Sequence, residues 1–532
     1  MTHSSAQLND LTDEILMIIF KNLNNDEILY SLVGVNKRLN TLVHDSAFTS
    51  HVTLMRRFSK NSIHPLSDTI LDRFLQILPS IRHKVQWLDV ESSSMERILL
   101  STNYPNLYGL GLYNLEIEKA KYLFTNETIL TDLFKNQISS LTIRIRRDNK
   151  HMLTNDKSTM IFTDIFTMFT NLQYLNFKPS SNCSQRLSFD LSPPIFISST
   201  LLKLHVNVDH FDDCLYLLDG RFTQLRVLHV NTFNIRHSSH LTINNTENLP
   251  NLKCFSLYCD ADTSAYDELI VPLLHRMLNL EKLHLYLIIC YKNTFIDGNN
   301  LKRNILNQMP KLNKFTFDIR SSFHLHNQIS LLSNEDIQHT FNDFQNNQII
   351  SCVDYFYEFG RGECHIYSYP YKREVYPRIT NNFPGGIFKY VREISLFDER
   401  PFEHKFFFQI SQSFPFMQKL ILCNGKPQND KQSRKLDDNN QNLSIIEYPN
   451  LSYLDLVEAH DDYVEQFLVD TNTCLPNNVF LLVDYQTLKR VTEDLTRKTT
   501  RTNCTKLGSL GLVRECEIPE YLKQYFPHTK IL

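Results

Sequence analysis

The sequence predicts an α/β solenoid, in which short parallel strands alternate with helical returns behind a small helical segment at the N-terminus. The first reason is a recurring phrase, Asn-Leu-x-x-apolar-x-Leu, found at Asn251-Leu-Lys-Cys-Phe-Ser-Leu257 and again 28 residues later at Asn279-Leu-Glu-Lys-Leu-His-Leu285. The second is size, because a chain of 532 residues, 42% hydrophobic and 21% charged, exceeds one ordinary domain several-fold. A phrase repeated along a long chain indicates a repeated structural unit.

The last three positions of the phrase predict a strand. They alternate apolar, polar and apolar, which is the period of a strand with one buried face. Roughly 15 to 25 residues then pass before the next copy, which is too many for a hairpin and enough for a helical crossover. Because such crossovers make successive strands parallel, we expect strands on a concave side and helices on a convex side.

Composition limits the partners and the compartment. The net charge is −3 and the pI is near 6.7, so no field of one sign would recruit nucleic acid or an anionic membrane. The 11 cysteines are scattered without a Cys-x-x-Cys pair, which suits a reducing compartment and predicts no zinc site. No apolar run approaches the roughly 20 residues of a membrane span, and residues 1–10 are polar. We therefore expect a cytoplasmic or nuclear protein without a membrane anchor or cofactor.

The first forty-odd residues follow helical rather than strand spacing. Apolar residues predict three short helices, the first beginning after Thr12 as its N-cap and the second after a capping pair formed by Asn24 and Glu27. Three helices of this length make a small core, so some of their apolar side chains should remain exposed for a partner.

Three motifs in this segment resemble the F-box: Leu11-Thr-Asp-Glu-Ile15, Ile19-Phe-Lys-Asn-Leu23 and Val35-Asn-Lys-Arg-Leu39. The family usually has proline where this chain has Thr12, and often tryptophan where it has Leu39. The resemblance implies that residues 5–47 bind the adaptor subunit of an SCF ubiquitin ligase and, through it, the cullin and RING subunits. A cap for the repeat array is the alternative. The residues matching the family's interface are Leu11, Thr12, Ile15, Leu16, Ile19, Phe20 and Leu23, with Ile28, Val35, Leu39 and Leu42 shared between core and contact.

Residues 48–84 are expected to form a helical linker or N-terminal cap of the repeat array. The stretch from Thr69 to Leu78 has an apolar face at helical spacing, and the helix is expected to stop before Pro79.

From residue 85 to residue 532 the phrase returns with intervals typical of the leucine-rich repeat, which this region resembles; three consecutive intervals, from Leu201 to Leu280, are 24, 27 and 28 residues. The family's asparagine after each strand is missing, so the curvature should be irregular. The first apolar residues of the copies are Val85, Leu107, Ile138, Leu172, Leu201, Leu225, Leu252, Leu280, Leu312, Val391, Met417, Leu451, Val479 and Leu507.

Two stretches interrupt the series. Residues 318–390 are aromatic and turn-rich, and contain either an insertion or degenerate repeats. Residues 424–442 are nearly all polar and predict a disordered loop. After them, a strand at 479–483, a helix at 485–497, a strand at 507–512 and a short ending around 521–525 should close the open edge.

Alternation within the strands also predicts which side chains face outward. A mixture of Tyr, His and Lys suits a surface that binds a target protein, although ordinary solvated strand faces would look the same. Asp318 is placed on this face too. The candidate target-binding residues are Tyr174, Lys178, His229, Tyr258, Lys282, His284, Tyr286, Lys314, Tyr453 and Asp455.

No catalytic motif is recognisable, and the pairs His237/His240 and His324/His326 lack further ligands for a metal. The leading hypothesis is therefore a non-catalytic substrate-recognition subunit of an SCF-type ubiquitin ligase, in which the helices bind the adaptor and the repeats bind the target. The alternative is a protein-interaction scaffold that does not drive degradation.

Overall fold

The computed structural model divides the chain into two compact units: unit 1 comprises residues 1–288 and 303–315, and unit 2 comprises residues 289–302 and 316–532. Each is a mixed α/β unit with a mainly parallel sheet. The array predicted at 85–532 is thus shared between two units. The structure describes residues 8–59, 62–124, 128, 134–146, 156–178, 186–189, 196–236, 247–290, 294–325, 331–344, 348–429, 444–513 and 520–532.

Unit 1 begins with a one-turn 3-10 helix, η1 (Leu8–Asp10), and the three predicted helices, α1 (Asp13–Phe20), α2 (Asn25–Leu32) and α3 (Lys37–Val43). Thr12 and Asn24 occupy the N-cap positions, but neither side chain makes a capping hydrogen bond, so the predicted side-chain capping is wrong. The cap that does form is at α3, where the Asn36 side chain accepts a hydrogen bond from the Leu39 N–H at 2.8 Å. Burial of apolar side chains, rather than capping, therefore holds α1 and α2 in place.

Residues 48–84 are not the helical linker that the sequence predicts. After α4 (Ser46–Thr49) they contain β1 (His51–Leu54), the antiparallel pair β2 (Arg56–Ser59) and β3 (Ser62–His64), and α5 (Asp68–Ile81). The predicted helix is present but continues through Pro79. Proline removes one backbone hydrogen bond there, and burial of Ile77, Leu78 and Ile81 outweighs that loss.

The sheet of unit 1 begins with β1, one strand earlier than predicted. His51 pairs with Trp87 in parallel register, and the phrase is present in the form Thr49-x-x-Val52-x-Leu54. Thr49 is fully buried in the place of the usual first apolar residue, which is why the apolar pattern missed this copy.

The strands that follow confirm the predicted phrase. Each begins two residues after the first apolar residue of its copy, and each pairs in parallel with its neighbour in the order β1-β4-β5-β6-β7-β8-β9-β10-β11. They are β4 (Trp87–Glu91), β5 (Gly109–Leu115), β6 (Ser140–Ile145), β7 (Tyr174–Lys178), β8 (Lys203–His210), β9 (Val227–Asn234), β10 (Cys254–Thr263) and β11 (Lys282–Ile289).

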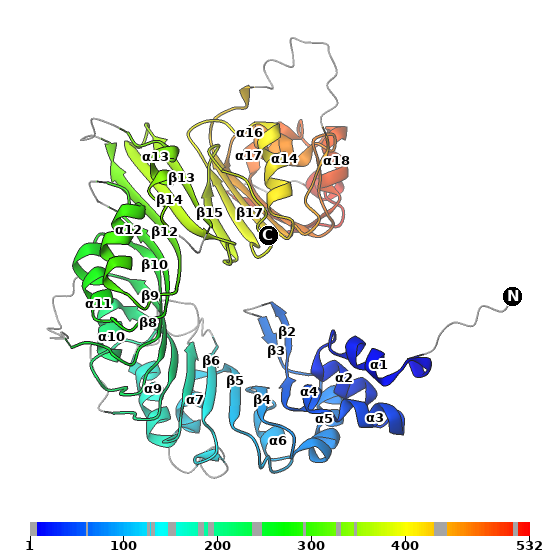
Figure 1. Ribbon diagram of the computed structural model, residues 1–532. Helices are drawn as coiled ribbons and strands as arrows, with labels where there is room; N and C mark the ends of the chain where they lie inside the picture. The colour runs from blue at the N-terminus through cyan, green and yellow to red at the C-terminus, as the bar shows by residue number, and fades with distance from the viewer. Residues whose placement is uncertain are drawn as a thin grey trace. The chain divides into compact units, whose positions relative to one another are not determined.

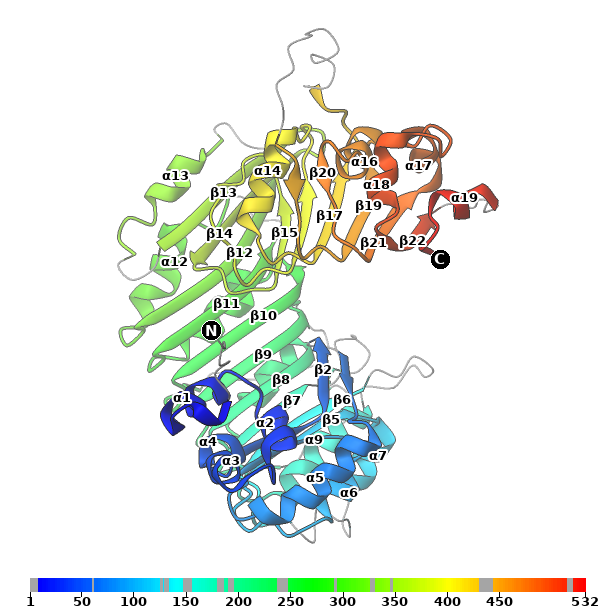
Figure 2. The ribbon, with the colours of Figure 1, turned by 90° about the vertical axis from the view of Figure 1, so that its right-hand side faces the viewer.

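Helices lie along one face of these strands (Figure 1). The opposite face of β8 to β11 carries no described helix, as the view onto it shows (Figure 2). The outward-facing side chains of these strands are therefore available to a partner. The helical segments of unit 1 are α6 (Met95–Leu99), α7 (Ile117–Leu123), α9 (Asp156–Met168), α10 (Phe211–Leu217), the π-helical turn η3 (Tyr266–Ile270), α11 (Val271–His275) and the 3-10 turn η4 (Leu306–Gln308).

In unit 2, residues 318–390 contain both an insertion and a degenerate repeat. β13 (Gln348–Phe356) and β14 (Arg361–Tyr369) form an antiparallel hairpin, and β14 also pairs antiparallel with β12 (Lys314–His324), so this hairpin is an insertion. By contrast, β15 (Val375–Ile379) pairs in parallel with β16 (Glu393–Phe397) and continues the repeat pattern. Two short helices precede the hairpin in sequence, α12 (Gly298–Asn304) before β12 and α13 (Asn334–His339) after it.

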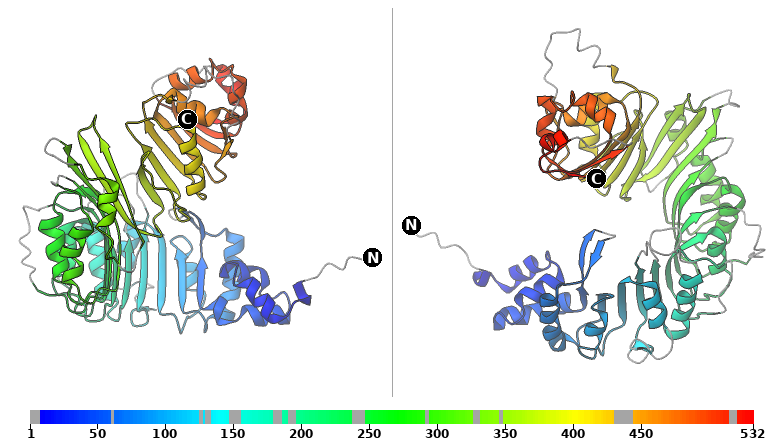
Figure 3. Two further views of the ribbon diagram at one scale, coloured as in Figure 1. Left: turned by 45° about the horizontal axis from the view of Figure 1, so that its top comes forward. Right: turned by 180° about the vertical axis from the view of Figure 1, so that it is seen from behind.

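The rest of unit 2 is a parallel sheet in the order β15-β16-β17-β19-β21-β22-β23, with helices beside it (Figure 3). The helix predicted at 485–497 ends at Val491, and the final β23 completes the edge. Of the loop predicted at 424–442, residues 430–442 lie outside the described residues, and Asn424 belongs to β17. The elements are β17 (Lys419–Asn424), β18 (Ile446–Glu447), β19 (Tyr453–Ala459), β20 (Thr473–Cys474), β21 (Val479–Asp484), β22 (Leu507–Val513), β23 (Lys530–Ile531), α14 (His404–Ser413), α16 (Asp461–Leu468), α17 (Tyr485–Val491), α18 (Lys498–Cys504) and α19 (Glu520–Tyr525).

Candidate functional site

Helix α1 and the turn after it present a row of exposed apolar side chains, which we call the α1 face: Ile15, Ile18 and Ile19 on the helix and Leu23 in the turn. Their exposed fractions are 45%, 63%, 38% and 49%. Three of them follow the spacing that places residues on one side of a helix. Val35, in the turn before α3, is exposed as well. Large apolar side chains grouped in this way are typical of a surface that another protein covers.

Four of the predicted adaptor-binding residues lie elsewhere. Leu16, Phe20, Ile28 and Leu39 are buried and form the interior of the helical segment, which agrees with the core share predicted for Ile28 and Leu39 and leaves Leu16 and Phe20 without an exposed side chain. The F-box motifs include residues from both sides of α1, and the motif match alone did not separate them. Leu11 and Leu42 are half-buried against this interior, and Thr12 is exposed. Ile18 was missed, although the spacing Ile15-x-x-Ile18 already placed it beside Ile15.

Arginines fix the helices that carry the α1 face. The Arg38 Nε donates to Asp13 Oδ1 at 2.7 Å, and a second Arg38 nitrogen donates to the Leu11 carbonyl, so α3 is tied to the start of α1. From α5, Arg73 donates to the Val33 carbonyl at 2.7 Å at the end of α2. The α1 face is therefore held by polar contacts as well as by its apolar interior.

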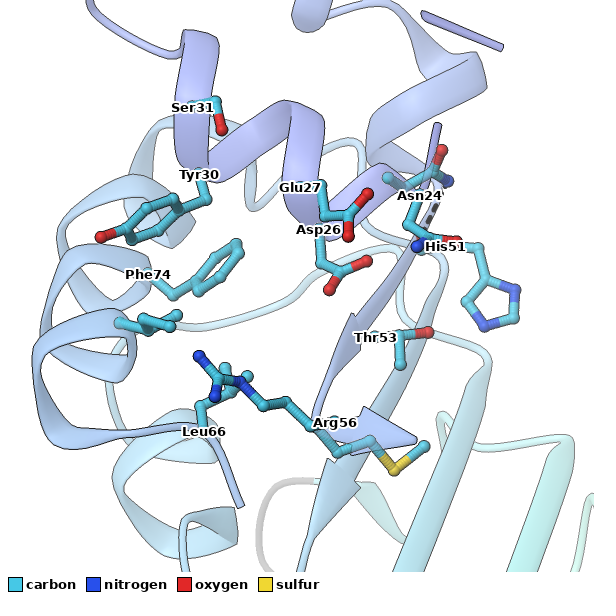
Figure 4. Close-up of a pocket in the computed structure, with 13 residues that line it drawn as sticks. Asn24, Asp26, Glu27, Tyr30, Ser31, His51, Thr53, Arg56, Leu66 and Phe74 are labelled. Carbon is cyan, nitrogen blue, oxygen red and sulfur yellow. Dashed lines mark hydrogen bonds between the residues drawn. The ribbon is translucent and has the colours of Figure 1, made fainter. Parts of the chain in front are cut away.

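Beside these helices is an open cleft of about 790 Å³ between α2, β1 and the start of α5 (Figure 4). Asp26 and Glu27 line one side, and Phe74 contributes apolar surface. No described cation lies within ion-pair distance of either carboxylate, and burial raises the pKa of Asp26. Across the cleft lies Arg56. The cleft can accept a side chain that combines an apolar stem with a polar end.

The open strand face of unit 1 brings together eight of the ten predicted target-binding residues. They alternate with buried residues along their strands, as the sequence predicts, and are half-buried or exposed. Parallel register aligns the strands in rows, so that Tyr174 lies opposite Lys203, and His205 lies opposite His229. The eight residues are Tyr174, Lys178, His229, Tyr258, Lys282, His284, Tyr286 and Lys314.

A chain of ring contacts crosses this face from β1 to β9. The ring centroids of His51 and Trp87 are 5.6 Å apart, those of Trp87 and Tyr174 are 6.5 Å apart, and those of Tyr174 and His205 are 5.5 Å apart. His205 and His229 follow at 4.2 Å. Trp87 reaches over β5 because residue 109 is glycine: a Cβ there would lie 2.0 Å from Trp87 Cε3.

The paired imidazoles are held in the neutral form. Burial, together with the neighbouring His229, Lys178 and Lys203, lowers the pKa of His205 to about 3. Burial and Lys178 also lower the pKa of His229. At neutral pH the two rings can therefore lie against each other without repulsion.

Unit 2 carries the other two predicted target-binding residues, Tyr453 and Asp455, on the outward side of β19. Here the lysine of the first row is paired: Lys419 Nζ lies 2.9 Å from Glu393 Oε1 and 5.1 Å from the centroid of the Tyr453 ring. On the same unit, a cup of about 350 Å³ is lined by aromatic side chains, including Phe359 and Phe397. This face has an apolar hollow with its nearby charges already paired.

Asp318 is not exposed on its strand face, contrary to the prediction. It is buried, and it accepts hydrogen bonds from His365 Nε2 at 2.8 Å, from the Tyr371 hydroxyl at 2.9 Å and from Arg373 at 2.7 Å. Burial by itself would raise the pKa of this carboxyl, but its bonds to His365 and the cations hold it below the ordinary value. Burial and the nearby Arg320 lower the pKa of His365 to about 4. The group is a closed, fully bonded network inside unit 2.

No group of three or more His, Cys, Asp or Glu residues within the described part of the chain could hold a metal ion. The described cysteines are free thiols. His237, His240 and His326 lie outside the described residues. No described helix has the length and apolar character needed to cross a membrane.

No protein-family model matches the chain, and no curated protein matches it significantly.

Proposed function

We propose that this protein is a non-catalytic substrate receptor of an SCF-type ubiquitin ligase. In this proposal α1 to α3 form an F-box that binds the adaptor subunit, and the strand-helix units form an irregular leucine-rich-repeat solenoid that binds the target protein. The protein would act in the cytoplasm or nucleus, where the ligase is found.

The exposed α1 face is the main observation that supports the proposal. The three motifs that resemble the F-box lie at the N-terminus in the family's order, and the first two span the helix whose Ile15, Ile18 and Ile19 are exposed. Each such side chain, once buried against an adaptor, would contribute roughly 1.5 to 3 kcal/mol to binding. Without a partner these residues would remain in contact with water.

The role of the repeats would be positional. A receptor without catalytic groups accelerates ubiquitin transfer by raising the effective concentration of target lysines near the charged enzyme. The outward rows of tyrosine, histidine and lysine support such a role because these residue types suit a protein-binding surface.

Co-purification with the adaptor tests the proposal. The variant Ile15→Asp/Ile19→Asp should lose the adaptor and cullin, because it places two charges in the apolar contact, while its thermal unfolding should match that of the wild type. Leu100→Asp is the control, since Leu100 is 60% exposed on unit 1 and directly follows α6, away from α1 in the sequence. Adaptor binding by the double variant at wild-type strength would refute the receptor function and leave a scaffold that captures partners without driving their degradation.

A further inference from the structure

The first three outward rows of β6 to β11 carry cations and no carboxylates, whereas Asp209 and Asp260 lie in the next row of β8 and β10, where Asp260 pairs with Arg186. We define the lysine face as the outward residues of β6 to β11 in the first three rows, together with Lys314 at the start of β12. It contains Arg144, Lys178, Lys203 and Lys282 as well as Lys314, and not one aspartate or glutamate. The chain as a whole has a net charge of −3, so this concentration of cations is local.

Three of these lysines make no ion pair within the described residues. No described carboxylate lies within ion-pair distance of Lys203, Lys282 or Lys314, whereas Lys253, one residue before β10, is paired with Glu281 at 3.2 Å. Lys203 and Lys282 are exposed on the first row, where a partner would reach them. Charges left without counter-charges on a binding surface favour a partner of opposite sign.

We infer that the lysine face binds an acidic peptide segment of the target protein. This inference rests on the proposed function and specifies what the receptor recognises. β8 and β11 are three strand spacings apart, so Lys203 and Lys282 are separated by roughly 14 Å. An extended peptide rises about 3.4 Å per residue, and carboxylates about four residues apart would therefore meet both lysines.

Uncharged polar groups between the lysines complete the site. Asn207, Asn231 and Ser256 lie in the second and third rows of β8 to β10, where side-chain amides and a hydroxyl can bond the backbone of a bound peptide. The contact between the His205 and His229 rings, 4.2 Å between centroids, holds the centre of the face in order. A surface ordered in advance loses less side-chain entropy on binding.

The ring geometry favours a peptide over a single-stranded nucleic acid. Nucleic-acid surfaces of this kind offer free aromatic faces on which bases stack. On the lysine face Tyr174 packs edge to face against His205 at 61°, and the Tyr258 and Tyr286 rings lie against each other at 48°, so each of these rings already contacts a neighbouring ring.

Fluorescence anisotropy with the full-length protein tests this inference without any ligase subunit. The probe is a labelled peptide with glutamates four residues apart on a serine and leucine background, and its control replaces every glutamate with glutamine. The variant carries Lys203→Glu, Lys282→Glu and Lys314→Glu. A matched variant carries Lys21→Glu, Lys37→Glu and Lys135→Glu, the same change in charge at exposed positions of unit 1 away from the face.

We expect the wild type and the matched variant to bind the glutamate peptide at least about tenfold more tightly than the glutamine peptide, with affinity falling as salt rises. The lysine-face variant should lose this preference at unchanged thermal stability. Equal affinity for the two peptides, or full binding by the lysine-face variant, would overturn the inference. Tighter binding of labelled polyuridine than of the glutamate peptide would also overturn it, in favour of a nucleic-acid surface. Because adaptor co-purification is measured separately, either proposal can fail without the other.

Discussion

In unit 1 the first outward row of the sheet holds lysines without described carboxylate partners, whereas in unit 2 the same row pairs Lys419 with Glu393. The third row differs as well: β10 and β11 carry Tyr258 and Tyr286, and β12 carries the buried Asp318. Both sheets repeat the same strand phrase. The phrase determines which positions point outward, but it does not determine which residue types occupy them. In this row, therefore, unit 1 has lysines without described carboxylate partners, whereas unit 2 has an internal ion pair.

Removing the carboxylate of Asp318 should have the largest effect. Asp318→Ala leaves the buried His365 and the partly buried Arg373 without their shared partner, and we expect unit 2 to lose about 3 kcal/mol of unfolding free energy. Urea denaturation measures this loss, with Asp455→Ala on the outward side of β19 as the control that should change stability by less than about 0.5 kcal/mol. If the two substitutions lowered the unfolding free energy equally, the claim that the buried Asp318 network stabilises unit 2 would be disproved.

A smaller effect is expected at Gly109 in unit 1. Gly109→Ala places a Cβ where the Trp87 ring lies, so the ring must leave β5 and its contact with Tyr174, at a cost of about 1 to 3 kcal/mol. Gly425→Ala is the control, because a Cβ there meets nothing within 4 Å. Trp87 is the only tryptophan of the chain, and its fluorescence reports the displacement directly. An unchanged emission spectrum would show that the ring chain does not depend on the glycine.

Acid should weaken unit 1 through the histidine pair. The pKa of His205 is lowered from 6.5 to about 3, with Tyr174 and Lys178 facing it from β7, Lys203 on its own strand and His229 on β9. Between these two values the unfolded chain binds more protons than the folded one, so stability is full above about pH 6.5 and decreases as the pH falls through this window.

His205→Asn combined with His229→Asn should reduce this loss, as measured by urea unfolding at neutral and acidic pH. The same measurement on His365→Asn shows how much of the acid sensitivity comes from unit 2, because burial and Arg320 also lower the pKa of His365, to about 4. An identical pH dependence in the wild type and the paired variant would rule out the histidine pair as its source.

The smallest effect is expected at Lys419. Lys419→Met removes a partly exposed ion pair with Glu393, which is worth about 0.2 to 1 kcal/mol, and should leave the acidic peptide bound as before. Loss of peptide binding by this variant would place the acidic site on unit 2 instead of unit 1. Anisotropy with the glutamate peptide distinguishes the two locations.

The positions of most strands were predictable from the sequence, because alternating apolar and polar residues within each phrase indicate a strand with one buried face. The exceptions have particular causes. β1 was missed because Thr49, a polar residue, fills a fully buried position. Asp318 was placed outside because alternation carries no information about its partner His365, which is 47 residues away on an antiparallel hairpin.

The candidate adaptor contacts were predictable only in part. The motif match selected residues on both sides of α1, and it took the observed burial of Leu16 and Phe20 to separate interior from surface. Ile18, the most exposed of the four on the α1 face, is outside the motif positions and was overlooked for that reason. A helical-wheel projection of α1 would have placed Ile18 on the same side as Ile15 and Ile19.

The hydrogen bond between α2 and β1 affects how the N-terminal helices can be removed by truncation. Asn25 of α2 donates to the His51 carbonyl at 3.2 Å, and β1 is the first strand of the sheet, so the helices shield what would otherwise be a bare strand edge. Cutting the chain after residue 47 would expose that edge to pairing with other molecules, and the shortened protein should self-associate. A truncated protein could then fail to bind the adaptor because it aggregates. Surface substitutions on α1 avoid this because they leave β1 covered.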